Sequence, residues 1–141
     1  MLADDDADDK SLFCEALSEI DPAIVCHTAS DGKEALTILT EKQIKKPSII
    51  FLDINMPIMD GWQCLGKLKE NTDHKDIPVI MYSTSSYQRD IEFALESGAF
   101  CFFTKPSDYR ELKNILRLIA TTPVTSLSDA MKEFKNLKFM K

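Results

Sequence analysis

The chain alternates between short, mostly apolar runs and longer segments in which apolar residues recur every three or four positions. The apolar runs cover residues 1–3, 23–29, 49–52, 79–82 and 100–104. Such runs are typical of strands that are covered on both faces, and strands that alternate with helices favour right-handed crossovers. The sequence therefore predicts an α/β fold with a doubly wound five-stranded parallel sheet and five helices.

The expected helices follow the apolar runs, and most of them have a candidate capping residue. Asp8 or Asp9 can cap the first helix, Ser85 or Ser86 the fourth, and Ser107 or Asp108 the fifth. The inward stripe of the first helix consists of Leu12, Phe13, Ala16, Leu17 and Ile20. The other inward faces carry Ala35, Leu36, Ile38 and Leu39; Cys64, Leu65 and Leu68; Ile91, Ala94 and Leu95; and Leu112, Ile115, Leu116 and Ile119.

About twenty residues follow the fifth helix, and they predict one more helix. Pro123 ends the preceding segment, and Ser126 can cap the new one. Its apolar stripe would consist of Leu127, Ala130, Met131, Phe134 and Leu137. A stable helix does not leave such a stripe in water, so we expect it to pack on its own domain or on a second copy in a homodimer. The alternative is a partly frayed extension.

The composition is that of a globular domain, with 44% hydrophobic and 28% charged residues in a chain of 141. The net charge of −6 argues against direct contact with nucleic acid, which requires clustered Lys and Arg. No apolar stretch approaches the roughly 20 residues that span a bilayer, and no signal segment opens the chain, so we expect a cytoplasmic protein without membrane insertion. Cys14, Cys26, Cys64 and Cys101 are scattered, which favours buried free thiols over disulfides or zinc.

Residues suited to phosphate and Mg²⁺ follow four of the five apolar runs. Asp4 and Asp5 follow the first run, Asp53 the third, Ser83 the fourth and Lys105 the fifth. Because parallel strands end at the same edge of a sheet, these side chains are expected to gather there. A cluster of carboxylates, a hydroxyl and an ammonium can hold a divalent cation and a phosphoryl group together.

The chemistry that this cluster favours is phosphoryl transfer to a carboxylate. Asp5 and Asp53 can ligate Mg²⁺ directly, while Asp4 holds a water ligand or supports the direct ligands. Asp53 is the expected nucleophile, because its strand lies between the acidic pair and the strand of Ser83. The metal would neutralise one equatorial phosphoryl oxygen, Lys105 a second, and the Ser83 hydroxyl with a backbone N–H the third.

Five stretches of the sequence resemble the CheY-like receiver domains of bacterial two-component response regulators. They cover residues 2–6, 52–57, 59–61, 79–83 and 104–106, which read LADDD, LDINMP, MDG, VIMYS and TKP. The resemblance implies the strand order 2-1-3-4-5. It also divides the chain into a receiver domain at residues 1–121 and a C-terminal extension at residues 122–141.

The resemblance implies a role for each matching position. Asp53 matches the phosphoacceptor aspartate, which a sensor histidine kinase or a histidine phosphotransfer protein would charge. Asp5 matches the direct Mg²⁺ ligand, Asp4 its acidic companion, and Asn55 the residue whose backbone carbonyl completes the metal site. The switch hydroxyl, the switch aromatic and the phosphate-binding lysine correspond to Ser83, Phe102 and Lys105.

Two further expectations come from the resemblance. The peptide bond between Lys105 and Pro106 matches one that is often cis in the family, and proline makes that isomer accessible. The output is expected through contact of the receiver surface or the extension with a downstream protein. We expect no enzymatic activity beyond the Mg²⁺-dependent phosphorylation and dephosphorylation of the chain itself.

Other interpretations of the same residues have less support. A haloacid-dehalogenase-type phosphatase uses a similar set, but its D-x-D motif is absent because the stretch from Asp53 reads D-I-N. A pseudo-receiver, which binds partners without phosphorylation, would not need the complete acidic, hydroxyl and lysine set. Asp6, Asp8 and Asp9 are interpreted as solvated acids or helix caps.

Overall fold

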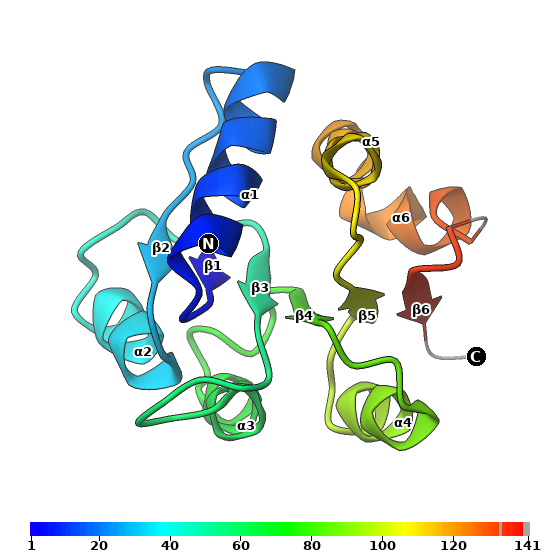
Figure 1. Cartoon of the computed structure of the whole chain (residues 1–141). Helices are drawn as coiled ribbons and strands as arrows, with labels where there is room; N and C mark the ends of the chain where they lie inside the picture. The colour runs from blue at the N-terminus through cyan, green and yellow to red at the C-terminus, as the bar shows by residue number, and fades with distance from the viewer. Residues whose placement is uncertain (133, 140–141) are drawn as a thin grey trace.

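The sheet of the computed structural model has six strands in the order β2-β1-β3-β4-β5-β6 (Figure 1). The structure describes residues 1–132 and 134–139. The strands are β1 (Leu2–Ala3), β2 (Thr28–Ala29), β3 (Ile50–Leu52), β4 (Val79–Ser83), β5 (Cys101–Thr104) and β6 (Leu137–Phe139). Neighbouring strands from β1 to β5 pair in parallel, whereas β6 pairs antiparallel with β5. The doubly wound fold and its strand order are confirmed, and β6 is an addition that the sequence pattern does not predict.

The helices form a layer on each side of the sheet. They are α1 (Ala7–Ile20), α2 (Gly32–Thr40), α3 (Gly61–Glu70), α4 (Gln88–Glu96), α5 (Tyr109–Thr121) and α6 (Val124–Ala130). Figure 1 shows α1 and α5 side by side above the sheet, with α6 next to α5, while α2, α3 and α4 lie below it. This arrangement covers both faces of the central strands, as their apolar sequences require.

Strand residues alternate between two cores, one on each face of the sheet. Phe51 belongs to the core under α1 and α5, while Ile50 and Leu52 belong to the core that α2, α3 and α4 cover. Phe13 of α1 lies 4.8 Å from Phe51 between ring centroids, in an edge-to-face arrangement that adds to the burial. Leu12 was expected on the same stripe but is 43% exposed.

The first helix begins earlier than the sequence pattern suggests. Its N-cap is Asp6, whose carboxylate accepts a hydrogen bond from the backbone N–H of Asp9 at 2.9 Å. The expectation that Asp8 or Asp9 caps this helix is therefore wrong, since both lie in its first turn. Acidic residues stabilise that position through the positive end of the helix dipole.

The fourth and fifth helices differ in their caps. Tyr87 occupies the N-cap of α4 without a side-chain hydrogen bond, so neither Ser85 nor Ser86 is the cap. The Ser85 hydroxyl accepts instead from the N–H of Tyr87 and donates to Asp90 at 2.6 Å, which ties the β4–α4 loop to the helix. Asp108 caps α5, one of the two residues expected there.

The C-terminal extension packs on its own domain. Leu127 and Met131 are fully buried in the core beside α5, and Leu137 is only 4% exposed in β6. The expected extra helix is present but ends at Ala130, and Ser126 lies inside it rather than at its start. The chain then forms a strand, because the free edge of β5 offers backbone groups that strand pairing satisfies. The described residues of the extension therefore form a helix and a strand.

Two of the four cysteines form a disulfide between α1 and the segment before β2. Cys14 and Cys26 have their Cα atoms 5.7 Å apart. This distance is typical of a disulfide, and it corrects the expectation that all four are free thiols. Cys64 and Cys101 are buried free thiols as expected, and burial raises the pKa of Cys64 to about 12. The pairing depends on tertiary contact and has no signature in the spacing.

Ile58, in the loop between β3 and α3, has a left-handed backbone with φ of 66° and is 77% exposed. A β-branched residue is strained there, whereas asparagine tolerates this conformation. Ile58→Asn should therefore raise the free energy of unfolding by roughly 1 kcal/mol, measured by urea denaturation. Val25→Asn is the matched control, because Val25 is 70% exposed and has no positive φ. Equal effects of the two substitutions would contradict the strain at Ile58.

Candidate functional site

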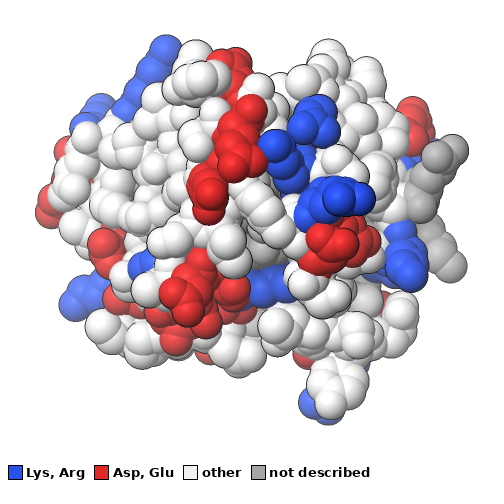
Figure 2. Space-filling view, turned by 45° about the horizontal axis from the view of Figure 1, so that its top comes forward, with Lys and Arg blue, Asp and Glu red and all other residues white. Residues whose placement is uncertain are grey.

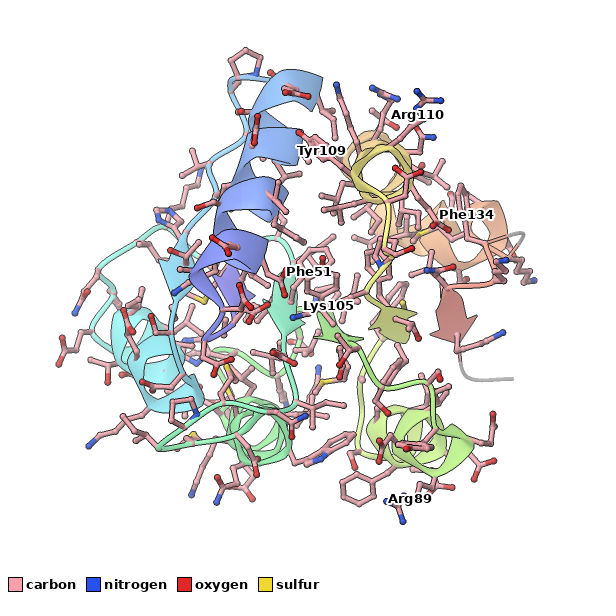
Figure 3. All side chains as sticks on the ribbon, viewed as in Figure 1. Phe51, Arg89, Lys105, Tyr109, Arg110 and Phe134 are labelled. Atoms are coloured by element: carbon pink, nitrogen blue, oxygen red, sulfur yellow. A yellow bond between two sulfur atoms is a disulfide. The ribbon has the colours of Figure 1, made fainter. Side chains whose placement is uncertain are left out.

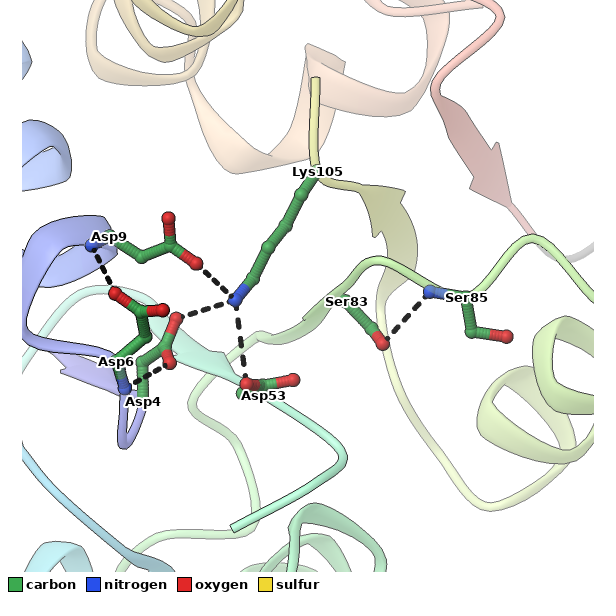
Figure 4. A network of polar contacts seen from close by, with 7 residues as sticks. All are labelled: Asp4, Asp6, Asp9, Asp53, Ser83, Ser85 and Lys105. Carbon is green, nitrogen blue, oxygen red and sulfur yellow. Dashed lines mark hydrogen bonds and ion pairs between the residues drawn. The ribbon is translucent and has the colours of Figure 1, made fainter. Parts of the chain in front are cut away.

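The predicted site residues gather at the carboxyl edge of the sheet (Figure 4). Asp4 and Asp53 follow β1 and β3 directly, and the N–H of Asp53 donates to the carbonyl of Ala3 at 2.9 Å. Ser83 is the last residue of β4, and its carbonyl accepts from the N–H of Lys105 at 2.7 Å. The parallel register therefore brings together residues that are up to 101 positions apart.

The ammonium group of Lys105 joins three carboxylates. Its Nζ lies 2.7 Å from Asp4 Oδ2, 2.9 Å from Asp9 Oδ2 and 3.4 Å from Asp53 Oδ2. The Asp4 side chain is fully buried and that of Lys105 is 9% exposed, so this ion pairing is shielded from water. Figures 3 and 4 show the lysine extending from the end of β5 toward the first turn of α1.

Asp9 is the site residue that sequence reasoning missed. It was interpreted as a solvated acid or a cap, yet its carboxylate contacts Lys105. The sequence contains a signal for this contact, because Asp6 is better placed than Asp8 or Asp9 to be the N-cap of α1. Starting the helix at Ala7 turns Asp9, in the first turn, toward the end of β1.

Three carboxylates lie close enough together to hold a metal ion. Asp4, Asp5 and Asp53 each offer one ligand oxygen, and these oxygens lie within 4.8 Å of one another. Hard divalent cations take such oxygen ligands. Asp4 Oδ2 already faces Lys105, and its Oδ1 accepts from the N–H of Asp6 at 2.9 Å. The exposed Asp5 and the carboxylate of Asp53 are therefore freer to ligate a cation directly.

The loop after β3 is shaped by a close backbone approach at Gly61. A Cβ atom at this position would collide with the backbone oxygen of Asp53. The N–H of Gly61 donates to the carbonyl of Ile54 at 2.9 Å, which closes the loop over the end of β3. Asn55 lies exposed in this loop, two residues beyond Asp53. Glycine thus allows α3 to begin directly beneath the site.

The surroundings of the site raise the pKa values of both Lys105 and Asp53. Burial raises the pKa of Asp53 to about 6; the positive charge of Lys105 opposes this shift, and the negative charge of Asp4 adds to it. Burial alone would lower the pKa of Lys105, but its hydrogen bonds to Asp4 and Asp9 outweigh burial and raise it. The ammonium also lies 5.1 Å from the centroid of the Tyr82 ring.

The raised pKa of Asp53 predicts a pH-dependent stability without added cation. The folded state binds this proton more tightly than the unfolded chain, so the stabilisation is present below pH 4 and is lost as the pH rises through about 6. Asp53→Asn should therefore match the wild type near pH 4 and unfold at a higher temperature at pH 7.5. Thermal melts in EDTA across this range measure the difference. A variant less stable at pH 7.5 would show that ionised Asp53 is favoured.

A divalent cation should stabilise the folded domain, because it binds the carboxylate cluster of the native state. A cation at a hundredfold excess over Kd adds about 2.7 kcal/mol to the free energy of unfolding. Asp5→Asn should remove most of the shift in thermal midpoint with millimolar Mg²⁺. Asp8→Asn is the matched control, because Asp8 is an exposed carboxylate in the first turn of α1. Equal shifts in both variants would place the cation elsewhere.

The structure locates both expected switch residues and corrects one expectation about the backbone nearby. Ser83 is 1% exposed, and its Oγ accepts from the N–H of Ser85 at 3.2 Å on the side of Asp53 away from Asp4 (Figure 4). Phe102 is fully buried in the core below the sheet. Every described peptide bond is trans, so the expected cis bond before Pro106 is wrong.

Acidic and basic side chains lie close together on one face of the molecule. Figure 2 shows acidic side chains gathered in a compact patch on the viewed face, with basic side chains beside it. The net charge of the chain is −6. Within the described residues, no helix is long and apolar enough to cross a membrane. The arrangement of carboxylates, ammonium and hydroxyl is suited to phosphoryl transfer assisted by a divalent cation.

Comparison with known proteins identifies the family. The model of the response regulator receiver domain matches residues 1–117. The response regulator Rcp1 of Synechocystis sp. is 31% identical over 125 residues, which cover 84% of this chain and 82% of that protein. A protein-glutamate methylesterase/protein-glutamine glutaminase of Methanococcoides burtonii is 35% identical over 123 residues, and the match spans 33% of its length.

Solved structures give the same result. The phosphorylated cyanobacterial phytochrome response regulator RcpA superposes with a TM-score of 0.77 at 31% identity, covering 84% of this chain and 87% of that chain. The Mn²⁺-bound form of Rcp1 has a TM-score of 0.71 at 25% identity and covers 99% of this chain and 96% of that chain. The chain therefore belongs to the response regulator receiver domain family and has the CheY-like fold of two-component signal transduction.

Proposed function

We propose that this receiver domain accepts a phosphoryl group on Asp53 with Mg²⁺ as its cation. The observation that supports this most strongly is the position of Asp53, whose carboxylate belongs to the cluster with Asp4 and Asp5 and lies 3.4 Å from the ammonium of Lys105. A nucleophile, cation ligands and a fixed positive charge are thereby present at one point. Asp5, Asp53 and the backbone carbonyl of Asn55 would hold the cation, supported by Asp4.

Each residue then has a definite task in the transfer. An oxygen of Asp53 attacks the phosphorus in line with the leaving group; the new O–P bond forms as the bond to the donor breaks, and its electron pair leaves with the donor. When bound, Mg²⁺ neutralises charge on the transferred group. Lys105 supplies the second positive charge, and the Ser83 hydroxyl, with a backbone N–H, donates to the remaining oxygen. The product is an acyl phosphate.

The proposal extends to partners and organisation. The donor is a sensor histidine kinase or a histidine phosphotransfer protein, and the output passes to a downstream protein rather than to nucleic acid. A relative from Borrelia burgdorferi, 28% identical with a TM-score of 0.62, was crystallised as a CheX-CheY-BeF₃-Mg²⁺ complex. We assign the receiver domain to residues 1–121, the end of α5, and the extension to residues 122–141. Within this proposal the domain is cytoplasmic and catalyses only its own phosphorylation and dephosphorylation.

Intact-mass spectrometry with acetyl phosphate tests the proposed function. The wild type should gain one phosphoryl group in Mg²⁺ and none in EDTA, and Asp53→Asn should gain none. Asp60→Asn is the matched control, because Asp60 caps α3 on the same loop and should not affect labelling beyond a small loss of stability. Labelling of Asp53→Asn would overturn the assignment. Steady hydrolysis of a phosphomonoester would indicate a phosphatase, and an unlabelled wild type a pseudo-receiver.

A further inference from the structure

Thr104 links the residue that precedes β6 to the candidate site. On one side of β5, the N–H of Thr104 donates to the carbonyl of Asn136 at 2.8 Å, and the Asn136 side-chain amide donates to the carbonyl of Thr104 at 3.2 Å. On the other side, the Thr104 hydroxyl donates to the carbonyl of Ser85 at 3.3 Å. The N–H of Ser85 in turn donates to the hydroxyl of Ser83. A continuous chain of hydrogen bonds therefore links Asn136, the residue before β6, to Ser83.

We propose that phosphorylation of Asp53 loosens the pairing of β6 with β5. The conformation of the extension then depends on whether Asp53 is phosphorylated. This inference rests on the proposed function. A phosphoryl group on Asp53 attracts the Ser83 hydroxyl and the Lys105 ammonium, which flank Thr104 on β4 and β5. Both lie on the side of β5 that faces β4, opposite β6. The end of β5 is drawn away from Asn136, and the two hydrogen bonds of that residue lengthen.

The extension has the properties of an element that can open separately. β6 has three described residues, lies at the edge of the sheet and, among the described strands, pairs with β5 alone. Short edge strands belong to the least stable parts of a fold. Leu127 and Met131, by contrast, are fully buried and hold the preceding helix in place. Opening is thus confined to the strand, and it frees the backbone groups of β5 for contact with another protein.

Thermodynamic linkage makes the effect reciprocal. If a ligand at Asp53 weakens the docking of β6 by a given factor, weakening that docking must strengthen binding at Asp53 by up to the same factor. Asn136→Ala removes the side-chain hydrogen bond to Thr104 while leaving the buried apolar residues unchanged. The variant should therefore bind a phosphoryl mimic more tightly. Lys135→Ala is the matched control, because Lys135 is an exposed neighbour in the same segment.

Hydrogen–deuterium exchange of the full chain with Mg²⁺, with and without beryllofluoride, tests the inference. Exchange at Thr104 and across residues 137–139 should accelerate at least about fivefold with beryllofluoride, while the loop around Asp53 becomes protected. Asn136→Ala should exchange fast already and bind beryllofluoride more tightly than Lys135→Ala.

The possible failures are distinguishable. Protection around Asp53 with unchanged exchange at Thr104 overturns the coupling and leaves the proposed function intact. Equal beryllofluoride affinity in Asn136→Ala and Lys135→Ala also overturns the coupling. No protection around Asp53 in Mg²⁺ overturns the proposed function, and with it this inference.

Discussion

Lys105→Met should lower the free energy of unfolding at pH 7.5, without divalent cations, by about 3 kcal/mol. The substitution keeps most of the apolar stem but removes the charge that faces three carboxylates at 3.4 Å or less. Asp4 is fully buried and would lose its counter-ion, and leaving one partner of a buried ion pair uncompensated is strongly destabilising. Urea denaturation in EDTA measures the loss.

A surface lysine provides the matched control. Lys113 pairs with Glu19 at 2.8 Å, but the two side chains are 28% and 42% exposed. Lys113→Met should therefore cost less than about 1 kcal/mol. Mg²⁺ should restore part of the deficit of Lys105→Met. Equal losses in the two variants at pH 7.5 would contradict the importance of the buried ion pairs.

Leu127→Ala should lower the free energy of unfolding by about 3 kcal/mol, although the residue lies outside the region that matches the family. Leu127 is fully buried in the core that contains Phe13 and Leu116, so truncation leaves a cavity between α6 and the receiver core. Val124→Ala on the same helix is the control, because Val124 is 40% exposed. Thermal and urea denaturation should separate the two variants. A Leu127→Ala variant as stable as Val124→Ala would show that the extension contributes little to the fold.

The sequence predicts the parallel sheet well because strands that are buried on both faces are continuously apolar. Ile50, Phe51 and Leu52 are all apolar, and the structure places them alternately in the two cores. β2 shows the limit of this reasoning, because only Thr28–Ala29 of the expected run from 23 to 29 is a strand. The rest of that run borders an open edge and lacks a second pairing partner.

The candidate site could be assembled from sequence because strand ends in a parallel sheet share one edge. Asp4, Asp53, Ser83 and Lys105 all lie where that rule places them. Asp9 was not assigned, because its contact with Lys105 depends on which aspartate caps α1. β6 and the disulfide of Cys14 could not be assigned either, because both depend on which segments meet in space.

The most direct measurement of the role of Asp53 is chemical mapping of the phosphorylated residue. The chain is treated with acetyl phosphate and Mg²⁺, reduced with borohydride and digested for peptide mass spectrometry. Borohydride reduces an acyl phosphate of aspartate to homoserine and leaves free carboxylates unchanged. The proposed function predicts homoserine at position 53 alone, and its absence from samples treated in EDTA. Homoserine at Asp4, Asp5 or Asp9, or a stable phosphoryl group on Ser83 without homoserine at position 53, would contradict it.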